Sequence, residues 1–426
     1  MGRSFYTLMA AQFFSSLADN AIYIAAITLL AQDKAPAWHA AALIPMFAFF
    51  YVLLAPYVGA LADSLPKGKV MFVANIIKII GCLLMLFGTH PIMSYAIVGL
   101  GAAAYSPAKY GILTEMLPTS KLVTANGWIE GLTIGSIILG VVMGGQLVGA
   151  TISGMLLSFD LPYMSTGVDT PAEAAISLIL GFYVLAAIFN LYIPATGVKL
   201  LPFPSNPIVL FKDFWVCNTR LWEDKLGQIS LATTTLFWGV AGNLRYIILA
   251  WAAAALSYDT TKSASLVGVV AIGTAVGAVV ASAYMKLDRA TSVIPLGVGM
   301  GVAVIFMNLI STLQMAVPFL IVIGALGGFL VVPMNALLQH RGHSLMGAGR
   351  SIAVQNFNEQ ACILGLGALF ACLTALKMSA YWAIGIFGAL VAVTMFLIGR
   401  WHKSNTIKYK DEVDRLLAIA RNDPSH

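Results

Sequence analysis

Long apolar segments separated by short polar loops run along almost the whole chain. A helix needs about 20 apolar residues to cross a bilayer, and these segments reach that length. A longer, more polar connector divides them into two groups of six, and a polar tail with helix-like patterning follows the last one. We expect membrane-spanning helices at 5–31, 38–62, 70–88, 91–115, 121–151, 171–194, 226–256, 262–286, 291–312, 315–340, 345–374 and 379–401.

The pattern predicts an all-α polytopic membrane protein with twelve transmembrane helices in two pseudo-symmetric six-helix bundles. The two halves echo each other, because Pro107 and Pro333 lie in corresponding fourth segments. Parallel repeats related by an axis along the membrane normal are a transporter architecture. We expect an N-terminal bundle at 1–194, a cytoplasmic connector at 195–225, a C-terminal bundle at 226–402 and a cytoplasmic tail at 403–426.

Composition and charge support a membrane protein and predict its orientation. Hydrophobic residues make up 59% of the chain and charged residues 10%, whereas soluble proteins carry about 25% charged residues. The net charge of +6 therefore bears on topology and on acidic lipid headgroups, and we expect no nucleic-acid partner. If both termini are cytoplasmic, the opposite side receives only Lys34, Lys262 and Lys377 among the basic loop residues. The positive-inside rule thus predicts cytoplasmic termini.

Signals of catalysis are missing from the sequence. The four cysteines form no Cys/His cluster that suggests zinc, and no Gly-rich Walker loop suggests ATP hydrolysis. None of the six histidines is followed by Asp at the spacing of a lipid acyltransferase. We expect no catalytic residues, no metal and no cofactor. A membrane-embedded lipid enzyme is a further hypothesis. Detection of a covalent product made by the purified protein alone would support it.

Charged residues inside apolar segments are the main functional candidates. A charge at the centre of a membrane helix costs about 2.5–3.5 kcal/mol on insertion scales, so it needs a partner, a cavity or a function. Asp19 lies on a polar stripe with Asn20 in the first segment, and Arg245 lies in the corresponding segment of the second half. Asp19 could attract the ammonium of a headgroup or pair with Arg245. A structural ion pair between two helices is the alternative for both residues.

A second candidate lies in the stretch 101–111 of the fourth segment. Small residues at 101–104 allow another helix to approach closely, and Pro107 loosens the turn before Lys109. Tyr105 and Lys109 are four residues apart and share a helix face. Lys109 could bind a phosphate as a point charge, as Arg245 could with its planar fork. Extension of the Lys109 side chain to the cytoplasmic surface is the alternative.

Acids and amides mark two further segments. Asn126 and Glu130 share a face of the fifth segment, and Gln355, Asn356 and Glu359 lie in the eleventh. They could contact substrate directly, or each acid could be hydrogen-bonded structure. For Lys78 in the third segment we expect a structural partner. The glycines of the fifth segment, which include small-xxx-small spacing, predict close helix packing.

The loop after the second segment carries a recognisable signature. It consists of a glycine, an aspartate four residues on and a basic-Gly-basic run: Gly59, Asp63, Lys67, Gly68 and Lys69. This arrangement resembles the loop signature of the major facilitator superfamily, where it acts as a conformational latch. We expect Asp63 to interact with a neighbouring helix N-terminus and the two lysines to stay at the cytoplasmic surface. A plain positive-inside turn is the alternative.

Within that superfamily, motifs spread over residues 5–400 resemble the bacterial lysophospholipid transporters. They are Asp19-Asn20-Ala21, the run from Gly101 to Leu113, Leu236-Phe237-Trp238-Gly239, Pro333 to Gln339, and Ala353 to Asn356. Three features depart from the family: His340 stands where an acid is expected, Arg350 adds a charge near a helix start, and the tail beyond 402 has no match.

The resemblance implies a flippase. It would move lysophosphatidylethanolamine and related lysolipids from the outer to the inner leaflet of the bacterial inner membrane for reacylation. A cavity with a lateral lipid opening would be exposed alternately to the two sides, with no proton gradient required. An acyltransferase–acyl-carrier-protein synthetase would be the cytoplasmic partner, and we expect a monomer.

A proton-coupled major facilitator carrier for a small polar solute or drug is the other candidate function. Asp19, Glu130 and Glu359 could relay protons in such a carrier. The run from Gly140 to Gly145 resembles the antiporter signature of the superfamily but lacks its proline. Collapse of transport on addition of a protonophore would favour this carrier.

Overall fold

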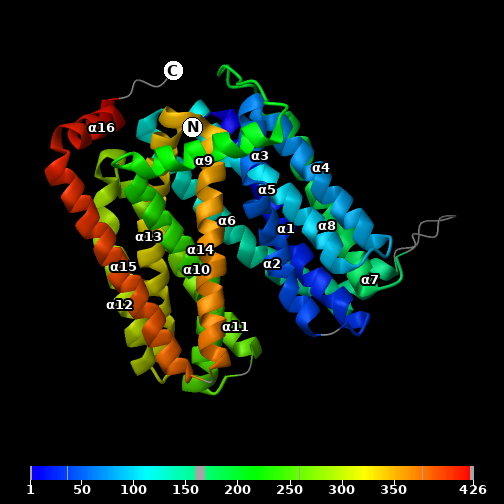
Figure 1. Ribbon diagram of the computed structural model, residues 1–426. Coiled ribbons are helices and arrows are strands. Elements are labelled where there is room, and N and C mark those ends of the chain that lie inside the picture. Colours follow the sequence, from blue (N-terminus) through cyan, green and yellow to red (C-terminus); the bar gives the residue numbers. More distant parts are fainter. Residues whose placement is uncertain (1, 36, 159–167, 259, 377, 423–426) are drawn as a thin grey trace. The chain divides into compact units, whose positions relative to one another are not determined.

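A computed structural model describes residues 2–35, 37–158, 168–258, 260–376 and 378–422 of the chain. Throughout these residues the regular structure is helical and no strand occurs, which confirms the all-α prediction (Figure 1). The first eight helices are α1 (Arg3–Gln32), α2 (Ala37–Leu53), α3 (Ala55–Ser64), α4 (Lys67–Leu86), α5 (Pro91–Met116), α6 (Thr119–Val148), α7 (Ala150–Leu157) and α8 (Pro171–Leu191). The others are α9 (Pro207–Glu223), α10 (Gly227–Leu256), α11 (Thr260–Tyr284), the 3₁₀ helix η1 (Leu287–Val293), α12 (Ile294–Phe306), the 3₁₀ helix η2 (Met307–Leu309), α13 (Leu313–Met346), α14 (Ala348–Ala375), α15 (Ala380–Lys408) and α16 (Lys410–Asn422).

Internal contacts divide the chain into two compact units. Unit 1 comprises Met1–Ile112 and Gly135–Phe211, and unit 2 comprises Leu113–Ile134 and Lys212–His426. The end of α5 and the start of α6 thus pack with the second unit, although they belong to the first half of the sequence. The division into two six-helix bundles, a connector and a tail stays a prediction.

Unit 1 is built around α8, which packs against both α1 and α4. The helix begins with a reciprocal capping box, in which Glu173 N–H donates to Thr170 Oγ1 and the Glu173 carboxylate accepts from the backbone N–H of Thr170. Such a box satisfies amide groups that the first turn leaves without helical partners. The expected second segment is two helices, since α2 and α3 meet at a 65° bend. Pro56, in the first turn of α3, cannot continue a helix from α2 because it lacks an N–H and crowds the preceding turn.

Unit 2 consists of helix pairs that approach closely through small residues. In the pair α11–α13, a Cβ at Gly273 would overlap the Ile321 backbone, and one at Gly328 would overlap the Thr274 backbone. Neighbouring pairs are α12 with α15 and α10 with α14. The amphipathic helix α16 packs on η1 and α15 at one end of the unit. Close contact through small residues is the main source of helix association in lipid, where apolar burial gives no driving force.

Helices that could cross a membrane account for most of the described chain. Eight described helices are long and apolar enough to do so, or up to ten if the two bent helix pairs each count as one span. Both α5 and α14 fall outside this set, although they contain 26 and 28 residues. Both helices carry polar residues: α5 has the stretch around Lys109, and α14 has Gln355 and Glu359.

Candidate functional site

Asp19 is the centre of a buried ion pair in unit 1. Lys78 Nζ of α4 donates to Asp19 Oδ2 at 2.8 Å, and the Tyr183 hydroxyl of α8 donates to Asp19 Oδ1 at 2.7 Å. The Lys78 side chain is 1% exposed, whereas the Asp19 side chain is 21% exposed. Because both carboxylate oxygens are bonded, the carboxylate is fixed in position and its charge is balanced. It still presents an open face to which a cation could bind.

Polar and aromatic groups complete the surroundings of Lys78. Its ammonium also donates to Ser15 Oγ at 3.0 Å, and Ser15 in turn donates to Asn75 Oδ1 at 2.9 Å. The ring centroid of Tyr105 lies 5.0 Å from Lys78 Nζ, within the range of a cation–π contact. Tyr105 therefore contributes its ring to this cluster. We call Asp19, Lys78, Tyr183, Ser15, Asn75 and Tyr105 the unit 1 cluster.

The partner of Asp19 was missed in the sequence. Lys78 was expected to have a structural partner, and Asp19 was expected to meet either a ligand ammonium or Arg245. A signal was present: Ser15 and Asp19 are four apart on α1, and Asn75 and Lys78 are three apart on α4, so each helix has a two-residue polar face. The side chain of Arg245 lies outside the described residues, so its pairing with Asp19 stays a prediction.

Two other candidates of unit 1 have different surroundings. Asn20 Nδ2 donates to the backbone oxygen of Ser16 in its own helix at 2.8 Å. Lys109 is buried, and its ammonium lies 4.1 Å from the ring centroid of Tyr110. Burial of Lys109 argues against the extended, solvent-exposed alternative, because an extended lysine keeps its charged end in water.

Unit 2 holds a reciprocal amide pair between α6 and α13. Asn126 Nδ2 donates to Gln339 Oε1 at 2.9 Å, and Gln339 Nε2 donates to Asn126 Oδ1 at 2.8 Å. Both side chains are buried, at 0% and 2% exposure. Each amide would cost free energy if it were left unpaired inside the protein. The pair therefore joins α6 to α13 in this structure.

One turn farther along α6, an amide–carboxylate chain links three helices. Asn335 Nδ2 of α13 donates to Glu130 Oε1 at 3.3 Å, and Gln355 Nε2 of α14 donates to Asn335 Oδ1 at 3.0 Å. Gln355 Nε2 also donates to Glu359 Oε1 at 2.7 Å. Among the described residues, the buried Gln355 Oε1 has no hydrogen-bond partner. The chain is therefore rich in acceptors and suits a ligand group that donates hydrogen bonds.

The structure thus brings four predicted site residues together in unit 2: Asn126, Glu130, Gln355 and Glu359. Asn356 is half-buried on the neighbouring position of α14 and takes no part in the hydrogen bonds just described. Asn335 and Gln339, which carried the family resemblance, were not proposed as site residues. They lie four apart on α13 and so share the face that meets α6.

The predicted latch is a compact turn between α3 and α4. Lys67 Nζ forms an ion pair with Asp63 Oδ1 at 3.2 Å and donates to the backbone oxygen of Ala62 at 2.6 Å. Lys67 is therefore buried, contrary to the expected surface position, while Lys69 is exposed. Gly59 is also buried. A Cβ at Gly68 would lie 3.0 Å from the Asn190 backbone oxygen, so glycine allows α4 to begin against the end of α8.

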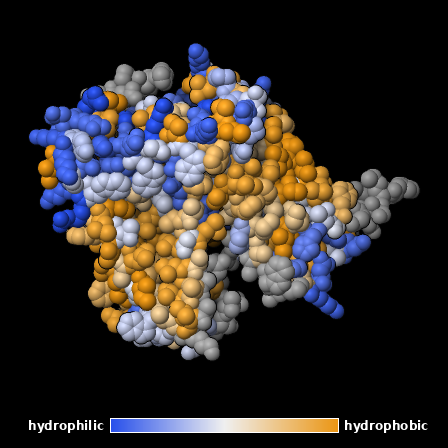
Figure 2. All heavy atoms as spheres, in the orientation of Figure 1, coloured by the Kyte–Doolittle hydropathy of each residue, from blue (hydrophilic) through white to orange (hydrophobic). Residues whose placement is uncertain are grey.

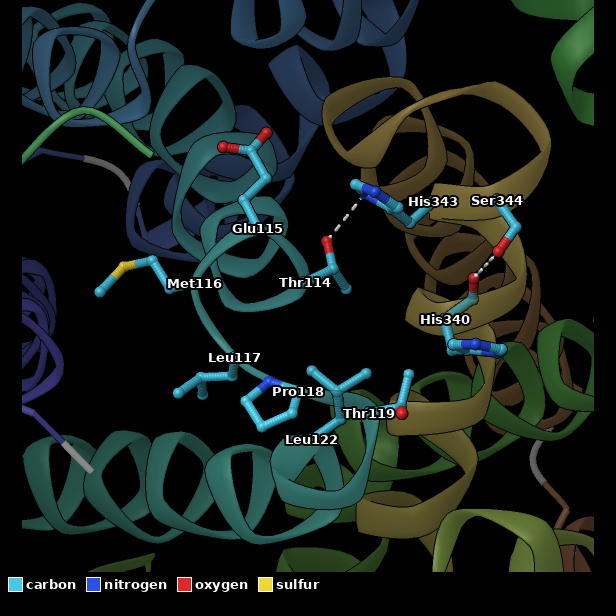
Figure 3. Close-up of a pocket in the computed structure, with 10 residues that line it drawn as sticks. All are labelled: Thr114, Glu115, Met116, Leu117, Pro118, Thr119, Leu122, His340, His343 and Ser344. Atoms are coloured by element: carbon cyan, nitrogen blue, oxygen red, sulfur yellow. Dashed lines mark hydrogen bonds between the residues drawn. The ribbon is translucent and has the colours of Figure 1, made fainter. Parts of the chain in front are cut away.

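A small pocket lies between the α5–α6 turn and the last turns of α13 in unit 2 (Figure 3). Thr114 Oγ1 and His343 Nδ1 are hydrogen-bonded across it at 3.1 Å, and His340 lines it from one turn away. Its volume of about 100 Å³ is well below the roughly 300–1,000 Å³ typical of ligand pockets. We therefore do not assign it to a lipid substrate.

Comparison with known proteins places this arrangement in a family. The family model for the Major Facilitator Superfamily matches residues 8–366. The "Lysophospholipid transporter LplT" of Yersinia pestis (strain Pestoides F) is 38% identical over 373 residues, which cover 87% of this chain and 86% of that protein.

Solved structures agree on the fold. The human organic anion transporter MFSD10 (TETRAN) superposes with a TM-score of 0.71 at 13% identity, covering 93% of this chain and 100% of that chain. FucP in the outward conformation gives 0.68 at 13% identity, covering 93% and 98%. The chain is a polytopic membrane protein of the major facilitator superfamily, and within it belongs to the family of the Yersinia lysophospholipid transporter.

Proposed function

We propose that this chain is a lysophospholipid transporter that moves lysophosphatidylethanolamine and related lysolipids from the outer to the inner leaflet of the bacterial inner membrane. The likeness to the Yersinia transporter over most of both chains is the observation that carries the substrate class. Reacylation by an acyltransferase–acyl-carrier-protein synthetase on the cytoplasmic side would consume the product. In this proposal the protein works as a monomer with both termini in the cytoplasm.

Recognition of the headgroup would use the charges buried in the apolar helices. A lysophosphatidylethanolamine headgroup carries one ammonium and one phosphate. The Asp19 carboxylate is fixed by two donors and remains partly exposed, so it suits the ammonium. Lys109 and Arg245 are the phosphate ligands in this proposal, the first as a point charge and the second as a bidentate fork.

The amide–carboxylate chain would form a second binding site, rich in hydrogen-bond acceptors. Glu130 and Glu359 supply carboxylate oxygens, and the open Gln355 Oε1 supplies a further acceptor. The ammonium and glycerol hydroxyl groups of the lipid are hydrogen-bond donors, so they could bind to these acceptors. Asn20, Tyr105, Asn126 and Asn356 would shape the path of the headgroup around these charged residues.

A lateral opening to the bilayer follows from the physical chemistry of the substrate. Each CH₂ group taken from hydrocarbon into water costs about 0.8 kcal/mol, so a long acyl chain would stay in the bilayer while the headgroup crosses. Alternating exposure of the polar path would then carry only the headgroup through the protein. The turn with Gly59, Asp63, Lys67, Gly68 and Lys69 is the proposed latch of that cycle.

The test uses purified protein in liposomes that carry a fluorescent lysophosphatidylethanolamine in the outer leaflet. Loss of the Asp19 charge in Asp19→Asn should slow inward movement by about tenfold or more, as expected when a charge-assisted contact is lost. Asp33→Asn is the matched control, because Asp33 is exposed at the end of the same helix. Equal rates in Asp19→Asn and the wild type would remove Asp19 from the site. No movement by the wild-type protein would refute the function.

An imposed pH gradient separates this function from the proton-coupled carrier. Glu130 and Glu359 are buried acids, and such acids could relay protons in a proton-coupled carrier. We expect the same rate of lysolipid movement with and without the gradient. A rate that follows the gradient and falls on addition of a protonophore would favour the carrier.

A further inference from the structure

A groove opens on the flank of unit 2 where η1 and the start of α12 face the C-terminal part of α15. Its volume is about 760 Å³, within the roughly 300–1,000 Å³ of ligand sites. The lining has a charged end with Arg289, Arg400 and His402 and an apolar end with Val298 and Phe396. None of these residues belongs to the two polar clusters described above.

The charged end of the groove is positive. Arg289 and Arg400 are exposed, and neither guanidinium makes an ion pair or hydrogen bond with any residue that the structure describes. Asp288 also lines the groove, but its Oδ2 accepts from both Nε and Nη2 of Arg421 at 3.1 Å. The one acid of the groove is therefore already neutralised by α16. Two arginines without a described acidic partner favour an anion.

The histidine His402 lines the groove together with these arginines. The Nδ1 atom of His402 is buried and has no hydrogen-bond partner among the described residues. A buried polar atom without a partner costs free energy unless a ligand or water satisfies it. His402 lines the same groove as Arg400, so a ligand held there could supply the missing partner.

The apolar end has room for a hydrocarbon chain. Phe396 lies one turn before Arg400 on α15 and is 53% exposed. Gly399 widens the groove at this level, because a Cβ added there would meet only Ile294 Cγ2, at an ordinary contact distance of 3.5 Å. The groove therefore continues from charged groups onto an apolar surface on a single flank.

A tryptophan pair next to the groove is typical of a membrane–water interface. Trp401 follows Arg400 and stacks on Trp222 of α9 with ring centroids 6.4 Å apart. Tryptophans concentrate at the headgroup level of a bilayer. Figure 2 shows a hydrophilic surface at the end of unit 2 that carries α16 and a mostly hydrophobic flank beyond it. Phe396, on the hydrophobic side of Arg400, would then face acyl chains, and the positive-inside rule makes this the cytoplasmic leaflet.

We propose that this groove binds an anionic diacyl phospholipid of the cytoplasmic leaflet. Its phosphate lies between Arg289 and Arg400, and one acyl chain lies along Val298 and Phe396. The continuity of cationic and apolar surface favours a lipid over a soluble anion, which would use only the charged end. This site is separate from the path of the transported headgroup and goes beyond the proposed function.

Lipid retention measured by native mass spectrometry tests the site without any transport assay. The purified full-length protein is equilibrated with equal amounts of palmitoyl-oleoyl phosphatidylglycerol and palmitoyl-oleoyl phosphatidylcholine. We expect the phosphatidylglycerol adduct to dominate, and Arg289→Gln and Arg400→Gln each to reduce it by about fivefold. Arg220→Gln, which removes an exposed charge of α9 away from the groove, should leave the adduct unchanged.

A steric variant tests the apolar end while both arginines remain. Gly399→Leu fills the space beside Ile294 and should reduce the adduct as strongly as the loss of one arginine. Excess glycerol 3-phosphate should not displace the lipid, because it lacks the acyl chain. Equal retention of the two lipids, an unchanged adduct in both arginine variants, an unchanged adduct in Gly399→Leu, or displacement by glycerol 3-phosphate would each overturn the proposal.

Discussion

At the scale of single residues, the charge of Asp19 inside α1 is balanced by its neighbours rather than left alone. Asp19 meets Lys78 and Tyr183, and the pair is almost closed to solvent on the lysine side. A buried ion pair adds little stability relative to an apolar pair, but loss of one partner leaves an uncompensated charge. Removal of the Lys78 charge alone should therefore destabilise the protein more than removal of both charges together.

Lys78→Met should destabilise the protein by about 3 kcal/mol, because the Asp19 charge would lose its counterion in an apolar surrounding. The double variant Asp19→Asn with Lys78→Met should recover most of that loss, since no unpaired charge remains. Thermal unfolding of the detergent-purified protein measures both. A double variant no more stable than Lys78→Met would show that the ion pair is not what holds this part of unit 1.

Tyr183→Phe tests whether the position of the Asp19 carboxylate matters apart from its charge. It removes the hydrogen bond to Asp19 Oδ1 and keeps the ring, so we expect a loss of about 1–2 kcal/mol at most. Lysolipid movement should fall more than stability does, because the carboxylate would keep its charge but lose one of its two fixed contacts. Transport rates and unfolding temperatures measured on the same preparation would show this. Unchanged transport would mean that the orientation of Asp19 does not matter.

At the scale of helices, close packing depends on which glycine faces which neighbour. A Cβ at Gly140 would lie 2.7 Å from the Leu17 backbone oxygen of α1, and one at Gly144 would lie 3.0 Å from the Ala21 oxygen. Earlier on α6, a Cβ at Gly127 would overlap the Ser282 side chain of α11. A Cβ at Gly131 would meet no described atom within 4 Å. The glycines of α6 thus fall into two groups. At some of them a side chain would clash with a neighbouring helix, and at others there is room for one.

Gly127→Leu and Gly131→Leu form a matched pair on α6. Gly127→Leu should destabilise the protein by about 1–3 kcal/mol, because the added side chain must displace Ser282 of α11. Gly131→Leu should be neutral or slightly stabilising, since leucine favours a helix interior more than glycine does. Thermal unfolding distinguishes the two. Equal losses in both variants would contradict the packing described for α6.

The sequence predicted helices better than it predicted contacts between helices. The length of the apolar segments located the helices, and the all-α prediction is confirmed in the described residues. Helical periodicity placed Asn126 with Glu130 and Gln355 with Glu359 on shared faces, and hydrogen bonds join Gln355 to Glu359 directly. It could not reveal that Lys78 meets Asp19, because periodicity shows which side of a helix a residue faces but not which helix lies there.

At the scale of the whole molecule, residues 113–134 connect the two units in an unusual way. They belong to α5 and α6, whose remaining residues pack in unit 1, yet their own contacts are with unit 2. Asn126 bonds to Gln339 of α13, and Thr114 bonds to His343 near its end. Both bonds lie within unit 2. If transport alternates the exposure of a polar path, these bonds to α13 are candidates to break during the cycle.

We therefore expect the hydrogen bonds of 113–134 to α13 to break and re-form during transport. Glu115 and Ser344 line the same small pocket. Spin labels on Glu115→Cys and Ser344→Cys, in a variant whose four native cysteines are replaced by serine, should give one short distance in the free protein. Lysophosphatidylethanolamine should add a second, longer distance, because release of α13 separates the labelled turns. A control pair within one flank of unit 2, Ser292→Cys and Ser404→Cys, should keep its distance. A single short distance under all lipid conditions would mean that these contacts are permanent, and that any alternation of access occurs elsewhere in the chain.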